Sequence, residues 1–343
     1  MNRKTEISVL NVLLCLMVIF IHVTSYPITS LSADSLAVKM LYPLQKLCGV
    51  AVYGFIFLSG LKLFLGGGRK VSLKKYYFSR LKRVYLPYVV FTVVYYLYEV
   101  QRGYFTFNPN ELAVFLLNGN VECHLYFVVI IMQFYILLPL WRYLINNKHS
   151  AVILLASAVL NILFVYKLPI FLEMAGIKGF SYNDRVFTSY LFFWVLGCFC
   201  GKNYERFKNI LTKNLSVYLL LFSAAFVMDT FLSFKAFTGQ SFYAVGEAVH
   251  LLYCFSAILF LYSAVLIFKD CRLANNKFMK SVDAASFEIY LVHILFVHIV
   301  NDIIVNHLSV GVLEAYAIRF ISVYILSIVS CVLYKKLISV KKG

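Results

Sequence analysis

The stretch Ile7-Ser-Val-Leu-Asn-Val-Leu-Leu-Cys-Leu-Met-Val-Ile-Phe-Ile-His-Val-Thr24 decides the fold class. It contains no Asp, Glu, Lys or Arg, and an apolar run of this length is typical of a helix that spans a bilayer. No small-residue cleavage site follows it, so we expect it to remain as a membrane span. Because an ionisable side chain inside such a span is costly, a functional role for His22 is the first hypothesis. The alternative is an interfacial histidine without a chemical task.

The composition extends this interpretation to the whole chain. Hydrophobic residues make up 62% and charged residues 14%, whereas about a quarter of the residues in globular proteins are charged. The sequence therefore predicts an all-α polytopic membrane protein, with residues 1–343 forming a single transmembrane domain and no separate soluble domain. About ten runs are long enough to span a membrane, and they lie at 7–26, 43–65, 84–101, 123–143, 150–168, 187–201, 215–234, 246–268, 285–305 and 313–334.

The net charge is +17, and the Lys and Arg residues cluster in short segments between apolar runs, as they do in the inner loops of membrane proteins. If the amino terminus is inside and all ten spans form, 23 of the 32 Lys and Arg residues fall in inner segments and six in outer ones. This bias predicts that both termini are cytoplasmic, and it makes nucleic acid an unnecessary partner. The eight cysteines lie mostly in or beside apolar runs, so we expect neither a disulfide framework nor a metal site.

The most basic inner segment, residues 66–88, contains seven cations. Their spacing predicts an amphipathic basic helix that leads into the third span. Two interpretations remain open. The segment either determines topology by resting on anionic lipid headgroups, or it binds a phosphorylated cytoplasmic cosubstrate through Arg80, Lys82 and Arg83, because the guanidinium fork matches phosphate oxygens.

Polar side chains also mark the fourth and ninth spans. Glu122 and His124 open the fourth span, at a depth similar to that of His22. A carboxylate beside two imidazoles suits general base catalysis, although interfacial His and Glu residues often only bind headgroups. His293 follows Ser286 by seven residues, so the two share a helix face. The further candidates for a polar cavity are Asn11, Lys62, Gln133, Glu288, Tyr290, His293 and Arg319, of which Lys62 is close enough to an inner end to snorkel.

Five stretches occur together in order and at suitable spacing: Val18–His22, Gly49–Gly60, Tyr77–Tyr88, His124-Leu-Tyr-Phe127 with Gln133–Pro139, and Ser286–His293. In these stretches the chain resembles the acyltransferase family 3 of integral membrane proteins over nearly its whole length. The His-Leu-Tyr-Phe form resembles the branch common in Gram-positive bacteria, which includes intercellular-adhesion polysaccharide modifiers.

The resemblance implies a ten-helix, multi-pass enzyme of the bacterial plasma membrane. It implies transfer of an acyl group, most simply acetyl, from cytoplasmic acyl-CoA to a hydroxyl of a cell-surface glycan or lipid-linked sugar, with no bound cofactor. His22 matches the family's catalytic histidine, and Arg80 and Arg83 match its basic motif. One departure is Asn11, where the family often has an arginine. Either another cation, such as Arg319 or Lys62, supplies the charge, or the activity is redirected or lost.

The expected chemistry assigns roles to these residues. His22 takes the proton of the acceptor hydroxyl as its oxygen attacks the thioester. Glu122 or His124 orients His22 or the acceptor, and Arg80, Lys82 and Arg83 hold the CoA phosphates. Two rival functions are a transporter or flippase and a non-catalytic partner in polysaccharide synthesis and export.

Overall fold

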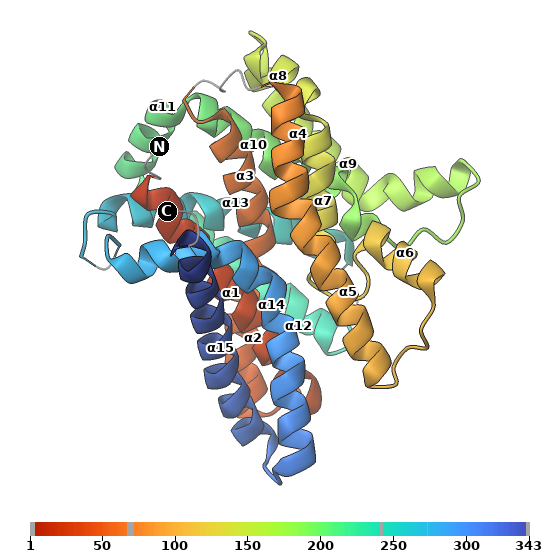
Figure 1. The fold of residues 1–343 in the computed structure, drawn as a ribbon. Helices are drawn as coiled ribbons and strands as arrows, with labels where there is room; N and C mark the ends of the chain where they lie inside the picture. The colour runs from red at the N-terminus through yellow and green to blue at the C-terminus, as the bar shows by residue number, and fades with distance from the viewer. Residues whose placement is uncertain (1–3, 67–71, 241–242, 273, 341–343) are drawn as a thin grey trace. The chain divides into compact units, whose positions relative to one another are not determined.

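The computed structural model describes residues 4–66, 72–240, 243–272 and 274–340. Throughout these residues the regular structure is helical, and no strand is present (Figure 1). The helices are α1 (Thr5–Ser30), α2 (Leu36–Cys48), α3 (Ala51–Phe64), α4 (Leu73–Arg80), η1 (Leu81–Tyr85), α5 (Leu86–Gln101), α6 (Pro109–Asn118), α7 (Tyr126–Ile136), α8 (Leu138–Asn146), α9 (Ser150–Met174), η2 (Asn183–Arg185), η3 (Phe187–Tyr190), α10 (Leu191–Lys202), α11 (Tyr204–Lys213), α12 (Leu215–Phe237), α13 (Tyr243–Phe268), α14 (Lys277–His307) and α15 (Val312–Val340).

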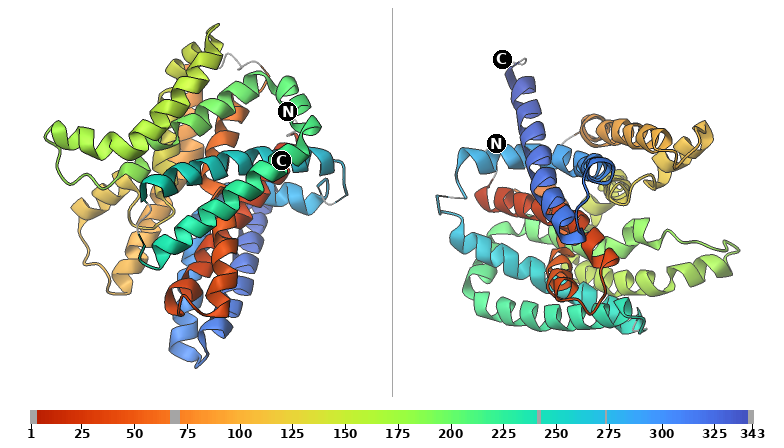
Figure 2. Two further views of the ribbon diagram at one scale, coloured as in Figure 1. Left: turned by 180° about the vertical axis from the view of Figure 1, so that it is seen from behind. Right: turned by 90° about the horizontal axis from the view of Figure 1, so that it is seen from below.

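The chain divides into two compact units, of which the first combines residues 1–55 with residues 206–343. In this unit α1 packs against α14, α15, α2 and α13, while α12 packs along α13 (Figure 2). Side chains such as Cys15, Ile19 and Ile289 fill the seam between α1, α14 and α15. The amino-terminal helix is therefore surrounded by carboxy-terminal helices, and the polar residues of α1 and α14 face one another.

The second unit comprises residues 56–205. Here α10 packs against α8 and α9, and α7 packs against α4, η1 and α6. The backbones of α3 and α10 approach closely because α10 carries glycine at the contact: a Cβ on Gly197 would lie 2.1 Å from the Phe57 carbonyl oxygen, and one on Gly201 would lie 2.4 Å from that of Leu61. This contact requires residues without a side chain.

Within the described residues, seven helical segments are long and apolar enough to cross a membrane, or eight if the bent pair α7 and α8 forms one span; one of the seven, Leu36–Phe64, combines α2 and α3. Seven of the ten predicted runs correspond to these long segments, for example 7–26 to Thr5–Ser30. The predicted run 123–143 is bent by 61° between α7 and α8. Pro139, in the first turn of α8, explains the bend, because proline lacks the N–H that would continue the α7 hydrogen-bond ladder.

Two predicted spans differ from the long helices in length. The run 84–101 corresponds to α5, a helix of 16 residues that continues from α4 and η1. The run 187–201, the shortest prediction, corresponds to the short apolar segment Phe187–Lys202. The protein is thus an all-helical, multi-pass membrane protein, while ten crossings and two cytoplasmic termini stay predictions.

Candidate functional site

The seam between α1 and α14 brings two histidines together. The ring centroids of His22 and His293 lie 5.1 Å apart, with an interplanar angle of 48°. His293 is fully buried, and its Nδ1 lies 2.7 Å from the Tyr290 carbonyl oxygen. Because a carbonyl only accepts, Nδ1 carries the hydrogen and the lone pair of the neutral His293 ring lies on Nε2. The hydrogen bond therefore fixes the tautomer of the histidine that contacts His22.

Asn11 lies on the same face of α1, eleven residues or three turns before His22. Its side-chain amide donates to Asp283 Oδ1 at 2.8 Å and to Ser286 Oγ at 2.7 Å. All three side chains are buried. Ser286 and His293 both face α1, as their spacing predicts. At this position the chain uses a neutral amide to hold a buried carboxylate.

Glu288 and Tyr290 occupy other faces of α14. Glu288 forms an ion pair with Lys335 of α15. Tyr290 is buried, and its ring lies 6.1 Å from that of His293. Glu288 therefore belongs to the α14–α15 contact, whereas Tyr290 packs beside the histidine pair.

Arg319 of α15 lies under the ring of Tyr26, with its Cζ 3.9 Å from the ring centroid. Its Nη2 donates to Asn301 Oδ1. Tyr26 follows His22 by one helical turn, so both side chains lie on the same face of α1. The cation of α15 is thus held by one residue of α1 and one of α14, and its α1 contact lies one helical turn after His22.

The first unit also contains a polar chain that the sequence analysis missed. His250 Nδ1 lies 3.2 Å from both carboxylate oxygens of Asp229, and Nε2 lies 3.5 Å from the Cys254 sulfur. Asp229 is 1% exposed. Both ionisable residues fall inside the apolar runs 215–234 and 246–268, a signal that was present in the sequence.

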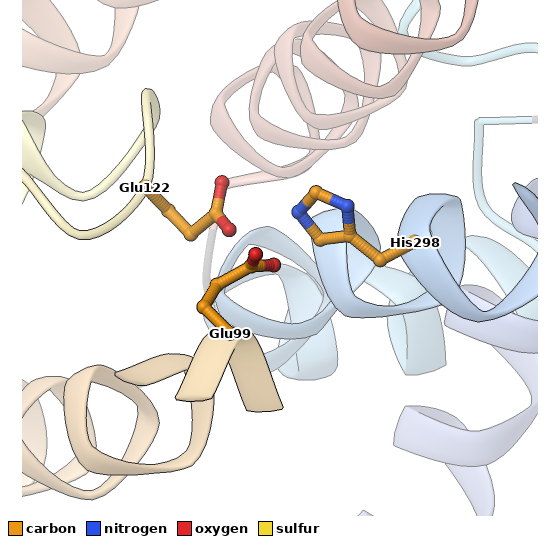
Figure 3. Close-up of side chains that lie close together, drawn as sticks. All are labelled: Glu99, Glu122 and His298. Atoms are coloured by element: carbon orange, nitrogen blue, oxygen red, sulfur yellow. The ribbon is translucent and has the colours of Figure 1, made fainter. Parts of the chain in front are cut away.

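In the second unit, Glu122 faces a further carboxylate. The oxygens of Glu99 and Glu122 lie within 4.8 Å of one another, and Figure 3 shows the two groups pointing toward each other. Arg102 donates to Glu99 at 3.1 Å. His124 is buried, and its ring centroid lies 5.5 Å from that of Tyr95. Because Glu122 and His124 belong to this unit, their role toward His22 stays a prediction.

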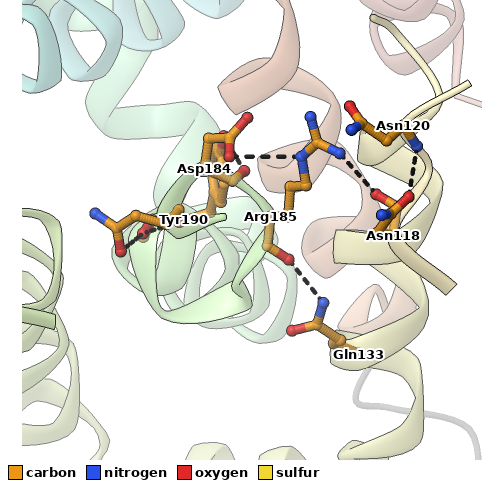
Figure 4. Close-up of polar contacts among 8 residues, drawn as sticks. Asn118, Asn120, Gln133, Asp184, Arg185 and Tyr190 are labelled. Atoms are coloured by element: carbon orange, nitrogen blue, oxygen red, sulfur yellow. Dashed lines mark hydrogen bonds and ion pairs between the residues drawn. The ribbon is translucent and has the colours of Figure 1, made fainter. Parts of the chain in front are cut away.

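Gln133 holds the backbone that precedes α10. Its amide nitrogen donates to the Arg185 carbonyl oxygen at 2.8 Å, and its amide oxygen accepts from the Phe187 N–H at 3.0 Å. The Arg185 guanidinium extends to the Asn118 carbonyl oxygen at 3.1 Å (Figure 4). The geometry indicates a positioning role for Gln133.

The predicted basic helix is α4, which continues through the π-helix η1 into α5. Two of the seven cations, Arg69 and Lys70, lie outside the described residues. The Arg80 guanidinium lies between two rings, with its Cζ 5.0 Å from the centroid of Tyr76 and 4.6 Å from that of Tyr135. Burial raises the pKa of Tyr76, although nearby Arg80 opposes this, so the hydroxyl stays protonated.

The two other predicted phosphate-binding residues lie in η1, directly after Arg80. Lys82 and Arg83 are exposed on η1, whereas Arg80 is half-buried. The π-helix adds a residue to its turn, with the Leu86 N–H bonded to the Leu81 carbonyl, and so alters the expected spacing of the three cations. Lys62 is half-buried near the end of α3. Of the three predicted phosphate-binding residues, Arg80 is thus held between two rings, whereas Lys82 and Arg83 are accessible.

The sequence profile of the acyltransferase domain of family 3 matches residues 5–336. A probable poly-beta-1,6-N-acetyl-D-glucosamine export protein of Staphylococcus epidermidis is 24% identical over 302 residues, covering 85% of this chain and 81% of its own length. The protein of the same name from Staphylococcus aureus strain N315 is 25% identical over 308 residues, covering 84% and 81%. No solved structure matches significantly.

The family profile spans both units and includes every candidate residue described above. The long apolar helices and the staphylococcal relatives agree with a multi-pass protein of a bacterial membrane. By this match the chain belongs to the acyltransferase 3 family, and it is a membrane acyltransferase.

Proposed function

We propose that this protein transfers an acyl group from cytoplasmic acyl-CoA to a hydroxyl of a cell-surface polysaccharide or its lipid-linked precursor. The family supplies the reaction class. The relatives are named for the export of a poly-N-acetylglucosamine, which supports a glycan acceptor. The observation that carries the proposal is the contact between His22 and His293, because it places two imidazoles together inside membrane-length helices.

His22 acts as the general base in this proposal. A hydroxyl is a weak nucleophile, so the imidazole takes its proton while the oxygen attacks the thioester carbonyl. The C–S bond then breaks, and the proton returns to the departing CoA thiolate. His293 holds His22 in orientation, since its own tautomer is fixed by the Tyr290 carbonyl. Burial of His293 supports this role, because a tightly packed ring keeps the same orientation from one turnover to the next.

The donor binds through the cations of α4 and η1. Lys82 and Arg83 are exposed and free to approach phosphate oxygens. Arg80 is held between Tyr76 and Tyr135, so its guanidinium is oriented before the ligand arrives. A π-helix in a long helix often marks a functional site, and this one carries the basic motif.

The test uses the purified full chain in lipid nanodiscs with radiolabelled acetyl-CoA and poly-N-acetylglucosamine oligomers. We expect label to appear in the oligomers, and His22→Ala to reduce the rate about a thousandfold. His149→Ala is the matched control, because His149 is exposed and should leave the rate unchanged. An unchanged rate in His22→Ala would contradict the assignment of the base.

Export of the glycan is the second candidate, and two observations in the first unit favour it. The long segment Leu36–Phe64 is interrupted between Cys48 and Ala51. The interruption lies beside His250, since a Cβ on Gly49 would be 3.4 Å from His250 Cε1. A buried acid–histidine pair beside a local irregularity in a membrane-length helix is a feature that ion-coupled carriers can use. Glycan uptake into inverted vesicles without label transfer would favour this candidate.

A further inference from the structure

We infer that Arg319 forms a subsite for an anionic group of the acceptor. The place of this subsite in the reaction rests on the proposed function. Arg319 is 3% exposed and lies on a membrane-length helix. Tyr26 covers its face, and Asn301 accepts from Nη2. The second terminal nitrogen, Nη1, is buried without a hydrogen-bond partner.

Among the residues that the structure describes, no carboxylate pairs with Arg319. Within residues 4–66, 72–240, 243–272 and 274–340, the groups in contact with the guanidinium are the neutral side chains of Tyr26 and Asn301. A buried cation without a counter-charge is strongly unfavourable. Of the acids on α14 and α15, Glu288 pairs with Lys335 and Glu314 accepts from the Gly311 N–H. The unpartnered N–H groups of Nη1 therefore suit an oxyanion from outside the chain.

The ligand chemistry follows from the donor. A guanidinium fork binds the paired oxygens of a phosphate or carboxylate. Tyr26 shields one face of the guanidinium, so the anion approaches in the plane of the fork. Asn301 holds Nη2 and thereby fixes the direction in which Nη1 points.

The position relative to His22 identifies the acceptor as the source of the anion. Tyr26 follows His22 by four residues on α1, which is about 6 Å along a helix axis. Because Tyr26 covers the guanidinium, an anion on Arg319 would lie about one helical turn of α1 along from His22. A lipid headgroup would need a cation on the outer surface of the bundle, whereas Arg319 is covered. The acceptor is therefore a glycan or glycolipid that carries a phosphate or carboxylate near the acylated hydroxyl, which among the acceptors of the proposed function favours a lipid-linked precursor over the neutral polysaccharide.

The experiment measures binding of radiolabelled glucose 1-phosphate to the full chain in phosphate-free maltoside micelles. We expect binding that glucuronate displaces and glucose does not, weakened at least about tenfold in Arg319→Gln. Arg206→Gln, at an exposed cation, is the matched control and should bind as the wild type does. Asn301→Asp is the second variant: it gives Arg319 an internal carboxylate, so it should abolish binding while raising the melting temperature.

Three results would overturn the inference: no binding, equal binding in Arg319→Gln, or Arg319-dependent binding of dihexanoyl phosphatidylglycerol alone. The last result would identify a headgroup subsite. Because the assay needs no turnover, it separates this inference from the proposed function. A chain that binds the sugar anion through Arg319 but transfers no acyl group would retain the subsite and contradict the enzyme.

Discussion

The His22 ring on α1 lies 5.1 Å from the His293 ring on α14, which joins the two ends of the sequence in one polar contact. His293 cannot turn freely, because its Nδ1 is bonded to the Tyr290 carbonyl oxygen. A fixed ring beside a catalytic base restricts the orientations of that base. The contact therefore separates the roles of the two histidines and leads to a kinetic prediction.

His293→Gln is expected to lower kcat for acyl transfer by about 10- to 100-fold, less than His22→Ala, and to leave KM for acyl-CoA unchanged. The reason is that His293 orients the base and does not touch the donor phosphates. Steady-state kinetics with varied acyl-CoA measure both constants. His307→Ala, at the exposed end of the same helix, is the control. A rise in KM with normal kcat would count against this role.

Asn11→Leu is expected to destabilise the protein by about 2 to 3 kcal/mol, because two buried hydrogen bonds are lost and Asp283 loses a donor. Asn11→Asp should be worse, since it places a second carboxylate beside Asp283. Thermal unfolding in micelles measures the difference. Asn110→Asp changes an exposed residue and should leave the melting temperature unaltered. Equal stability of Asn11→Leu and wild type would show that the network contributes little.

The sequence predicts the long helices well, because length and hydrophobicity alone set a membrane span. The expected run 215–234 became α12 at Leu215–Phe237, and the expected run 7–26 became α1 at Thr5–Ser30. The bend after α7 was not predicted, although Pro139 signals it. A proline inside an apolar run can end one helix and begin the next, so the length of the run alone does not predict one straight helix.

The contacts between helices were much less predictable. In a membrane span the lipid-facing and protein-facing sides are both apolar, so periodicity does not indicate which helices pack together. The sequence placed His22, His293 and Arg319 on their helices, but it did not pair His22 with His293 or place Tyr26 over Arg319. The π-helix η1 was not predicted, and neither were the two rings around Arg80, because they come from two different helices.

Gln133→Leu is expected to lower stability by about 2 to 3 kcal/mol and to leave kcat and KM of the folded fraction unchanged. The amide nitrogen and the amide oxygen of Gln133 bond the backbone at Arg185 and Phe187. The substitution therefore leaves a backbone carbonyl and a backbone N–H without these partners. Gln133→Glu keeps the acceptor and loses the donor, and it should fall between the two. Melting temperature and steady-state rates distinguish the effects. A fall in kcat at unchanged stability would move Gln133 into the reaction.

Gly197→Ala is expected to destabilise the second unit by about 3 kcal/mol, because the new Cβ would lie 2.1 Å from the Phe57 carbonyl oxygen and separate α3 from α10. Gly246→Ala is the matched control. Gly246 lies within α13 with no atom within 4 Å of the added Cβ, so the change should stabilise by about 0.5 to 1 kcal/mol. Unfolding in denaturant compares the two. Equal stability of both variants would contradict the close approach of the helices.

Arg83→Gln is expected to raise KM for acyl-CoA by about tenfold at low salt, with a smaller effect at high salt, because an exposed cation acts on phosphate through a screened field. Arg80→Lys should raise KM at both salt concentrations, since it loses the planar group held between Tyr76 and Tyr135. Initial rates at two ionic strengths measure this contrast. Lys208→Gln, at another cation, controls for a general loss of charge. If all three variants shift KM equally, the basic segment acts only as a diffuse positive surface, and the specific role of Arg80 in donor binding is wrong.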